Sequence, residues 1–179
     1  NLGDVTALDV NNGSLVLQTP TQTNTIYQNA FSLENSDLVF ENNTIYFSNN
    51  KNEFYSIDAR TGTVKWAQSI NSNLRPTIIE NLIFTISNEG YLFIIDDPTG
   101  NIIRITDVLK NFKDKLEIKP IGFIHAKNKV YVSLSNGRLV TINSSTGVQE
   151  NIKKINNSKI SRPYILNNSM YLIKDNACL

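Results

Sequence analysis

The stretch that decides the fold is residues 54–66, which read Phe54-Tyr55-Ser56-Ile57-Asp58-Ala59-Arg60-Thr61-Gly62-Thr63-Val64-Lys65-Trp66. It predicts a strand that ends in an aspartate, a tight turn that closes on a glycine, and a second strand. The Asp58 side chain can accept hydrogen bonds from backbone N–H groups of the turn, and Gly62 tolerates the positive φ that closes it. The segment is therefore expected to form a β-hairpin.

The same plan occurs four times along the chain. Its acidic or amide marker and its turn glycine are Asp9 and Gly13, Asp58 and Gly62, Asp96 and Gly100, and Asn143 and Gly147. Both markers keep the same intervals of 49, 38 and 47 residues. A period of roughly 40 to 50 residues is typical of the blades of a β-propeller. We interpret these residues as structural markers of a repeat.

A second pair of strands is predicted before each later hairpin. Its signature is an apolar residue followed by an aromatic one: Ile45-Tyr46, Ile83-Phe84, Val130-Tyr131 and Met170-Tyr171. Polar turn residues such as Ser48-Asn49-Asn50 follow, which suits a hairpin into the next strand. Each unit is therefore predicted to supply four short antiparallel strands. Helical periodicity appears only in residues 107–116, a Lys-rich insert that predicts either one short surface helix or a solvated loop.

The phase of the repeat places both ends of the chain inside blades. We predict an all-β fold, a β-propeller of four-stranded antiparallel blades with about four blades present, as a single partial propeller over residues 1–179. The blade pieces are approximately 1–18, 19–67, 68–105, 106–151 and 152–179. Because four blades is the lower end of the range for propellers, the chain is expected to be part of a longer, eight-bladed ring. The alternative is self-association of two partial propellers through their open edges.

Residues 58–66, with Trp66 four residues after Gly62, resemble the pyrroloquinoline-quinone-like repeat. In that repeat the tryptophan packs between neighbouring blades. The equivalent positions here hold Leu17, Arg104 and Asn151, so aliphatic packing is expected to join the other blades. Among proteins with this repeat, the chain is most similar to the C-terminal half of the outer-membrane assembly lipoprotein family, the B subunit of the β-barrel assembly machinery.

This resemblance implies a non-catalytic protein-binding scaffold in outer-membrane β-barrel protein assembly. It further implies a location at the periplasmic face of a bacterial outer membrane, other subunits of the assembly complex as partners, and no cofactor. Lipid attachment in that family uses an N-terminal cysteine, which this chain does not contain. Acidic loops between blades contact the barrel subunit in that family. The connector of residues 31–37 lies near that place, which makes Glu34 and Asp37 candidate partner-binding residues, with a merely solvated loop as the alternative.

Two other functional classes stay open, a fragment of a quinone-dependent dehydrogenase and a ligand-sensing propeller. The dehydrogenase resemblance implies a catalytic aspartate, calcium ligands and a vicinal cysteine pair, but Cys178 is the single cysteine. Asp58 and Asp96 occupy a position of the repeat that is marked in every blade, which favours turn capping over catalysis. The pair Asp96-Asp97 is interpreted as a solvated turn rather than a metal site. His125 is the only histidine and is assigned a structural role. We predict no enzyme.

The charge balance limits the classes of partner that the sequence indicates. The chain carries 17 Lys and Arg against 16 Asp and Glu, a formal net charge of +1. This charge is too small to indicate nucleic acid or an anionic membrane as the main partner. No apolar run approaches the roughly 20 residues that span a bilayer, so the sequence predicts no membrane span in this chain.

Overall fold

The computed structural model describes residues 4–21 and 34–174. Within these ranges it contains sixteen β-strands and no α-helix. Three sheets have four strands each, and two have only two strands. The four-stranded sheets are β3 (Val39–Glu41), β4 (Thr44–Asn49), β5 (Glu53–Asp58) and β6 (Val64–Gln68); β7 (Thr77–Ile79), β8 (Leu82–Ile86), β9 (Tyr91–Asp96) and β10 (Ile102–Asp107); and β11 (Pro120–Ala126), β12 (Lys129–Leu134), β13 (Arg138–Asn143) and β14 (Gln149–Lys154).

The two-stranded sheets stand at the ends of the described chain. They are β1 (Val5–Leu8) with β2 (Leu15–Thr19), and β15 (Tyr164–Leu166) with β16 (Ser169–Tyr171). By the phase of the repeat, β1 and β2 correspond to the third and fourth strands of a blade. The strands β15 and β16 correspond to the first and second strands of a blade. Every sheet is antiparallel and follows chain order. The predicted all-β propeller fold with about four blades is therefore confirmed.

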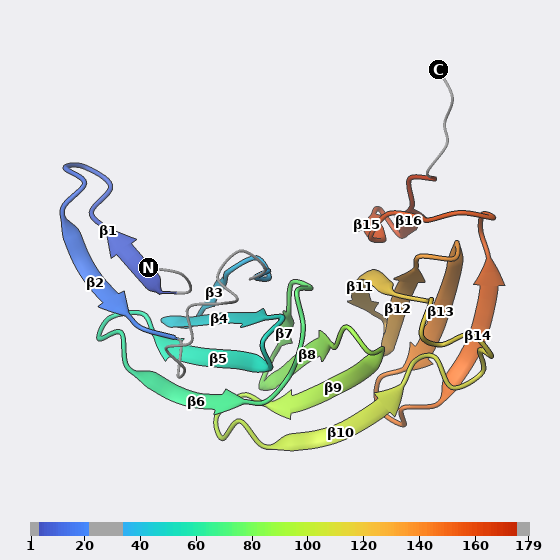
Figure 1. Cartoon of the computed structure of the whole chain (residues 1–179), viewed down its shortest axis with the longest axis horizontal. Helices are drawn as coiled ribbons and strands as arrows, with labels where there is room; N and C mark the ends of the chain where they lie inside the picture. Colours follow the sequence, from blue (N-terminus) through green and yellow to red (C-terminus); the bar gives the residue numbers. More distant parts are fainter. Residues whose placement is uncertain (1–3, 22–33, 175–179) are drawn as a thin grey trace.

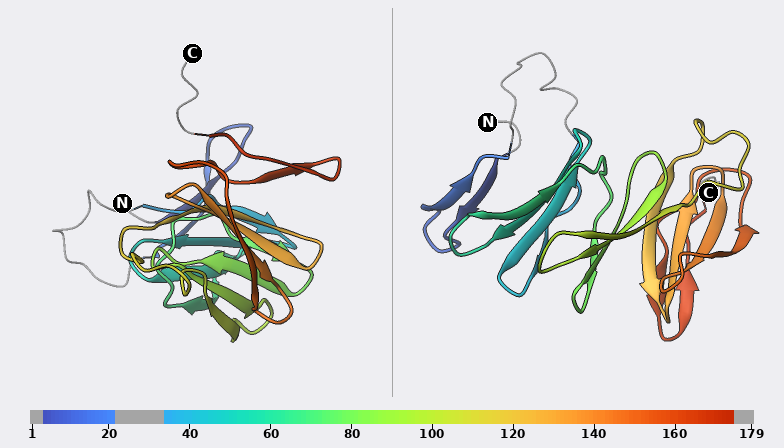
Figure 2. Two further views of the ribbon diagram at one scale, coloured as in Figure 1. Left: turned by 90° about the vertical axis from the view of Figure 1, so that its right-hand side faces the viewer. Right: turned by 90° about the horizontal axis from the view of Figure 1, so that it is seen from below.

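The blades are arranged as a crescent (Figure 1). The first strand of each complete blade, β3, β7 or β11, lies on the concave side, and the fourth strand, β6, β10 or β14, lies on the convex side. Figure 2 shows the sheets standing next to one another as twisted plates, so that each blade packs its face on the next. The concave side is consequently lined by the first strands and by the linkers that enter them.

The hydrophobic core lies between blades. One cluster joins the β7–β10 and β11–β14 blades and includes Phe84, Leu92, Phe123, Val132 and Val140. A second cluster joins the β3–β6 and β7–β10 blades through Tyr46, Phe54, Ile70, Ile83 and Ile95. Alternating strand residues point to opposite faces of a sheet, so each complete blade can contribute to a cluster on both sides. Burial of these faces stabilises the array of blades.

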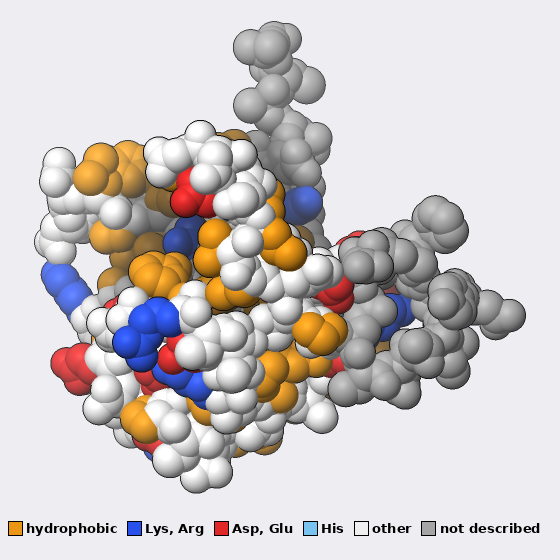
Figure 3. All heavy atoms as spheres, turned by 90° about the vertical axis from the view of Figure 1, so that its left-hand side faces the viewer, with side chains coloured by type: hydrophobic (Ala, Val, Ile, Leu, Met, Phe, Trp, Pro, Cys, Tyr) orange, Lys and Arg blue, Asp and Glu red, His pale blue; other side chains and the backbone are white. Residues whose placement is uncertain are grey.

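The two end sheets leave apolar side chains exposed. On β2, Leu15 and Val16 are exposed, as are Tyr164 and Leu166 on β15 and Tyr171 on β16. Figure 3 views the molecule from the end that carries β1 and β2, and it shows apolar side chains at the surface there. Tyr46 and Phe84, which correspond to Tyr171 in complete blades, are buried, whereas the residues that correspond to Leu15 and Val16, such as Val64 and Ile103, are exposed in complete blades as well.

Blades dock through the turn glycine of one unit and the fourth strand of the unit before it. A Cβ atom on Gly62 would lie 3.5 Å from a methyl carbon of Leu17, and one on Gly100 would lie 2.6 Å from Cγ of Trp66. A Cβ on Gly147 would lie 2.8 Å from Cδ of Arg104. The three docking residues are those that occupy the tryptophan position of the repeat.

The contact at Arg104 combines the expected aliphatic packing with a hydrogen bond. The aliphatic part of Arg104 covers Gly147, and its Nη1 also donates a hydrogen bond of 3.1 Å to the carbonyl oxygen of Ser144. An arginine can dock a blade because its long stem packs like an aliphatic chain while its charged end finds a polar partner. Charge at this position therefore does not disrupt the contact between blades.

The insert between β10 and β11 is not a helix. Residues 108–111 and 115–117 form turns, and the other residues of the insert are irregular. Val108 and Leu109 are buried, and the Leu109 side chain packs against Gly90. Between these anchors and Ile118, which is buried again, Leu116 is 92% exposed, so the insert is a loop that is fixed near both ends and solvated in part between them.

Candidate partner-binding groove

One position of the repeat brings residues from four successive blades to the concave side. The turn after the first strand of each blade starts with a residue of positive φ: Asn42, Glu80, Lys127 or Asn167. Five residues before each of them stand Asp37, Arg75, Gly122 and Arg162. These four residues lie in or next to the linkers that enter the first strands, and all four line one pocket.

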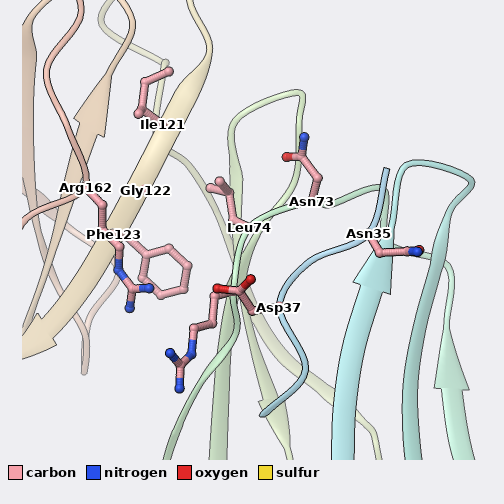
Figure 4. Close-up of a pocket in the computed structure, with 9 residues that line it drawn as sticks. Asn35, Asp37, Asn73, Leu74, Ile121, Gly122, Phe123 and Arg162 are labelled. Atoms are coloured by element: carbon pink, nitrogen blue, oxygen red, sulfur yellow. The ribbon is translucent and has the colours of Figure 1, made fainter. Parts of the chain in front are cut away.

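This pocket has a volume of about 190 Å³. Its other lining residues are Asn35, Asn73, Leu74, Ile121 and Phe123. Figure 4 shows the space between Asp37 and Asn35 on one side and Arg162 and Phe123 on the other, with Asn73 and Leu74 between them. The pocket is thus formed by blades that are adjacent in space but separated by tens of residues in the sequence.

A second hollow of about 380 Å³ adjoins the first through the shared residues Asn73 and Ile121. Glu34, Asn88, Lys119 and Pro120 complete its lining. We call the two hollows together the axial groove. Its charged side chains are the carboxylates of Glu34 and Asp37 and the cations of Arg75, Lys119 and Arg162.

Both sequence-predicted partner residues line the axial groove. Glu34 is held in place, because its carboxylate accepts a hydrogen bond of 2.8 Å from Asn73 Nδ2 and its backbone N–H donates to Asn50 Oδ1 at 3.1 Å. The Asp37 side chain is exposed, whereas neighbouring Ser36 is buried. The remaining connector residues of the prediction, Phe31 to Leu33, lie outside the described residues. The structure therefore adds to the acidic connector a set of cations that the sequence analysis did not identify.

Arg162 reaches the groove because Gly122 has no side chain. A Cβ atom on Gly122 would lie 2.7 Å from Cβ and 2.8 Å from Cγ of Arg162, closer than side chains tolerate. Arg162 therefore lies directly on the backbone of β11. In the sequence, both arginines are followed by proline, at residues 75–76 and 162–163, and the two Arg-Pro pairs have the same phase in the repeat. This recurrence is the sequence pattern that indicates the two cations.

The repeat markers lie at the other end of the strands, away from the axial groove. Asp9 Oδ1 accepts a hydrogen bond from the N–H of Asn11 at 2.8 Å, and Asp58 Oδ1 accepts from Arg60 and Thr61 at 2.9 and 3.0 Å. Asn143 Oδ1 accepts from Ser145 and Thr146, both at 3.0 Å. These hydrogen bonds hold the pKa of Asp58 below its usual range. This is the geometry of turn capping.

The Asp96-Asp97 pair is engaged in structural contacts. Asp96 accepts from the backbone of Thr99 in its own turn at 3.2 Å. Asp97 Oδ1 accepts from the Tyr46 hydroxyl at 2.6 Å, and its carbonyl oxygen accepts from Trp66 Nε1 at 2.7 Å. Burial and the Asp97 carboxylate raise the pKa of Tyr46, so this hydroxyl keeps its proton. Asp97 thus joins two blades.

The remaining candidate residue of the sequence, His125, has structural contacts. The His125 ring packs against Phe84 in a tilted arrangement with ring centroids 4.9 Å apart, its Nε2 lies 3.1 Å from Ser144 Oγ, and burial lowers its pKa. Over residues 4–21 and 34–174, three or more His, Cys, Asp or Glu side chains nowhere come together to hold a metal ion. The same ranges contain no helix long and apolar enough to cross a membrane. Cys178 lies outside the described residues.

Solved structures support the fold. BamB from Moraxella catarrhalis matches with a TM-score of 0.71 and 15% identity over 95% of this chain and 48% of the other. The computationally designed Ika8 protein matches with a TM-score of 0.72 and 14% identity over 94% of this chain and 48% of the other. The β-propeller domain of Myceliophteria thermophila Cps50 (Swd1) matches with a TM-score of 0.69 and 10% identity over 93% and 54%. The chain spans about half the length of these proteins.

Sequence comparison gives the family. No curated protein sequence matches the chain. A family model described as outer membrane protein assembly factor BamB matches residues 1–106, which confirms the resemblance that the repeat indicated. Because the matched residues are more than half of the chain, the chain belongs to the family of the outer membrane protein assembly factor BamB.

Proposed function

We propose that the chain is part of a non-catalytic scaffold that binds other subunits of an outer-membrane β-barrel assembly complex. Its place is the periplasmic face of a bacterial outer membrane, and it needs no cofactor. The observation that carries this proposal is the family match over residues 1–106, which includes the acidic connector. Loops displayed on a rigid array of blades are typical partner-binding elements.

The axial groove is the surface through which we propose that the scaffold contacts its partner. Glu34 and Asp37 line it, and Asn73 fixes the Glu34 carboxylate. A fixed carboxylate loses less side-chain entropy when a partner cation binds it. A quinone-dependent dehydrogenase is the weaker candidate, because Asp58, Asp96 and Asp97 are occupied by turns and blade contacts.

The test is a titration of the chain, and of the full-length propeller that contains it, with the soluble domains of the barrel subunit. We expect Glu34→Gln combined with Asp37→Asn to weaken binding by about tenfold or more, since removing one partner of a close charge pair at an interface costs on this scale. Calorimetry or surface plasmon resonance measures the affinity.

The matched control is Asp9→Asn. It also removes a carboxylate, but at a turn away from the groove, where the equivalent Asn143 shows that an amide caps equally well. We expect this variant to bind like the parent. If it binds as weakly as the groove variant, the assignment of Glu34 and Asp37 is wrong. If the full-length propeller binds none of the domains, the scaffold function itself is contradicted.

A further inference from the structure

We propose that the axial groove recognises an extended acidic peptide segment and that Arg75 and Arg162 are the residues that bind its carboxylates. The inference rests on the proposed scaffold function, because it names the chemistry of the segment that enters the same groove. It adds to the contacts proposed for the acidic connector, because the partner segment that offers a cation to Glu34 and Asp37 is expected to carry acidic side chains as well, opposite the two arginines.

The first support is the placement of the two arginines. Arg75 and Arg162 occupy the same position of the repeat in two different blades, and both line the pocket of about 190 Å³. Between them in the chain, the blade of β11 has Gly122 at this position. That blade therefore contributes no side chain at this position, and the space is taken by the stem of Arg162.

The second support is that Arg75 and Arg162 form no ion pair with another described residue. Within the part of the chain that the structure describes, the three ion pairs join Arg60 to Asp58, Lys115 to Asp107, and Lys129 to Glu150. None of them involves a charged group of the axial groove. Asp37 lines the same pocket without pairing to either arginine among the described residues. Within residues 4–21 and 34–174, no carboxylate therefore occupies either guanidinium group.

The third support is the chemistry of the groups. A guanidinium offers a planar fork of donors that matches the two oxygens of a carboxylate, which makes Arg the preferred residue for such recognition. Lys119 adds a further cation in the adjoining hollow, whereas the Glu34 carboxylate there is already engaged by Asn73.

The shape and the charge order favour an extended segment over a small anion. The two hollows adjoin and are open to solvent. Together they are lined by residues of the linkers that enter several blades. Asp37 belongs to the linker into β3 and repels acidic groups there. The acidic side chains of a bound segment are therefore expected near Arg75 and Arg162, with neutral or basic residues next to Asp37.

The experiment uses fluorescence anisotropy with a labelled decapeptide of alternating Glu and Gly, and with the same peptide carrying Gln for Glu. We expect the Glu peptide to bind, the Gln peptide to bind at least about tenfold more weakly, and added salt to weaken the Glu peptide because exposed charges are screened. Arg75→Gln combined with Arg162→Gln is expected to weaken Glu-peptide binding by about tenfold or more.

Two further variants test the location of the charge and the geometry of the site. Arg60→Gln removes an exposed cation from a turn outside the groove and is expected to leave binding unchanged. Gly122→Ala keeps every charge but displaces the Arg162 stem, and we expect it to weaken binding as well. Circular dichroism melts of each variant show whether the fold is retained.

The proposal is overturned if the double arginine variant remains folded and binds the Glu peptide like the parent, or if the Gln peptide binds as tightly. It is also overturned if inorganic phosphate at the peptide concentration displaces the peptide, because the groove is then a site for small anions. The assay does not use assembly subunits. If the Glu peptide binds but the assembly subunits do not, only the scaffold function is contradicted. If the subunits bind and the double arginine variant binds them like the parent, only this inference is contradicted.

Discussion

Gly100 serves both a turn and a contact between blades. Its φ of +73° is a conformation that residues with a Cβ atom seldom adopt, and Trp66 from the neighbouring blade leaves no space for a side chain. Gly13 has nearly the same φ, +71°, but no heavy atom lies within 4 Å of the position a Cβ would take. The two glycines therefore separate the cost of backbone strain from the cost of steric exclusion.

We predict that Gly100→Ala destabilises the chain by roughly 2 to 4 kcal/mol, because strain and a clash with Trp66 act together. Gly13→Ala should cost only about 1 kcal/mol, the cost of the left-handed conformation. Urea denaturation followed by circular dichroism measures both. Equal losses in the two variants would show that Trp66 does not restrict this turn.

His125 predicts a pH dependence of stability. Burial lowers its pKa in the folded chain, so the unfolded chain, with an ordinary value of about 6.5, takes up a proton more readily. Stability is therefore expected to fall as the pH decreases from about 6.5 toward the lowered pKa of the folded state. Thermal melts between about pH 5 and 7.5 measure this loss.

The variant His125→Gln is the control for this prediction, because it cannot take up the proton. We expect its melting temperature to change less over the same pH range than that of the parent. If both chains show the same pH dependence, another group is responsible.

At the level of the elements, the contact of β6 with the neighbouring blade depends on Trp66. Its ring stacks on Phe54 with centroids 5.8 Å apart, and its Nε1 donates to the carbonyl oxygen of Asp97 at 2.7 Å. The Tyr46 hydroxyl donates to the side chain of the same Asp97. Asp97, the first residue of the turn after β9, thus accepts hydrogen bonds from β4 and β6 of the preceding blade.

We predict that Trp66→Leu destabilises the chain by roughly 1 to 3 kcal/mol, because it removes both apolar contact and the hydrogen bond. Trp66→Phe keeps an aromatic ring on Phe54 and should lose only about 1 kcal/mol. Since Trp66 is the single tryptophan, circular dichroism rather than fluorescence must follow unfolding. A larger loss for Phe than for Leu would contradict this account of the contact.

Over the whole molecule, stability is expected to be highest in the middle of the crescent. The strands β8, β9, β12 and β13 lie inside four-stranded sheets and carry most of the largest cluster, whereas the two-stranded end sheets expose apolar residues on β2, β15 and β16. In an array of repeats each unit is stabilised mainly by its neighbours.

We therefore predict slow amide hydrogen exchange in β8, β9, β12 and β13 and faster exchange by about tenfold or more in β1, β2, β15 and β16. Hydrogen exchange measured by mass spectrometry gives the protection of each strand. Uniform protection from β1 to β16 would show that the crescent opens only as a single unit. In the full-length propeller, the end strands should gain protection where further strands cover them.

The site was predictable only in part. The acidic connector was identified from its composition and its resemblance to a loop of the family, and the structure places Glu34 and Asp37 on the groove. Arg75 and Arg162 were not identified, because the equivalent positions hold Asp37 and Gly122 and so form no recurrent residue type. Turn chemistry favours a structural role for Asp96 and Asp97 over a metal site, but the contacts of Asp97 with Tyr46 and Trp66 emerge only in three dimensions.

The sequence by itself determined the blades, because a capped turn such as residues 58–62 and the alternation of a strand are local interactions among neighbouring residues. Only the tertiary structure decided that Arg104 docks a blade, that the insert at residues 108–119 is a loop, and that cations gather beside the acidic connector. Asp37, Arg75, Gly122 and Arg162 are about 40 residues apart from one to the next along the chain. They meet because blades stack around a common concave side, and that packing leaves no mark in any short stretch of sequence.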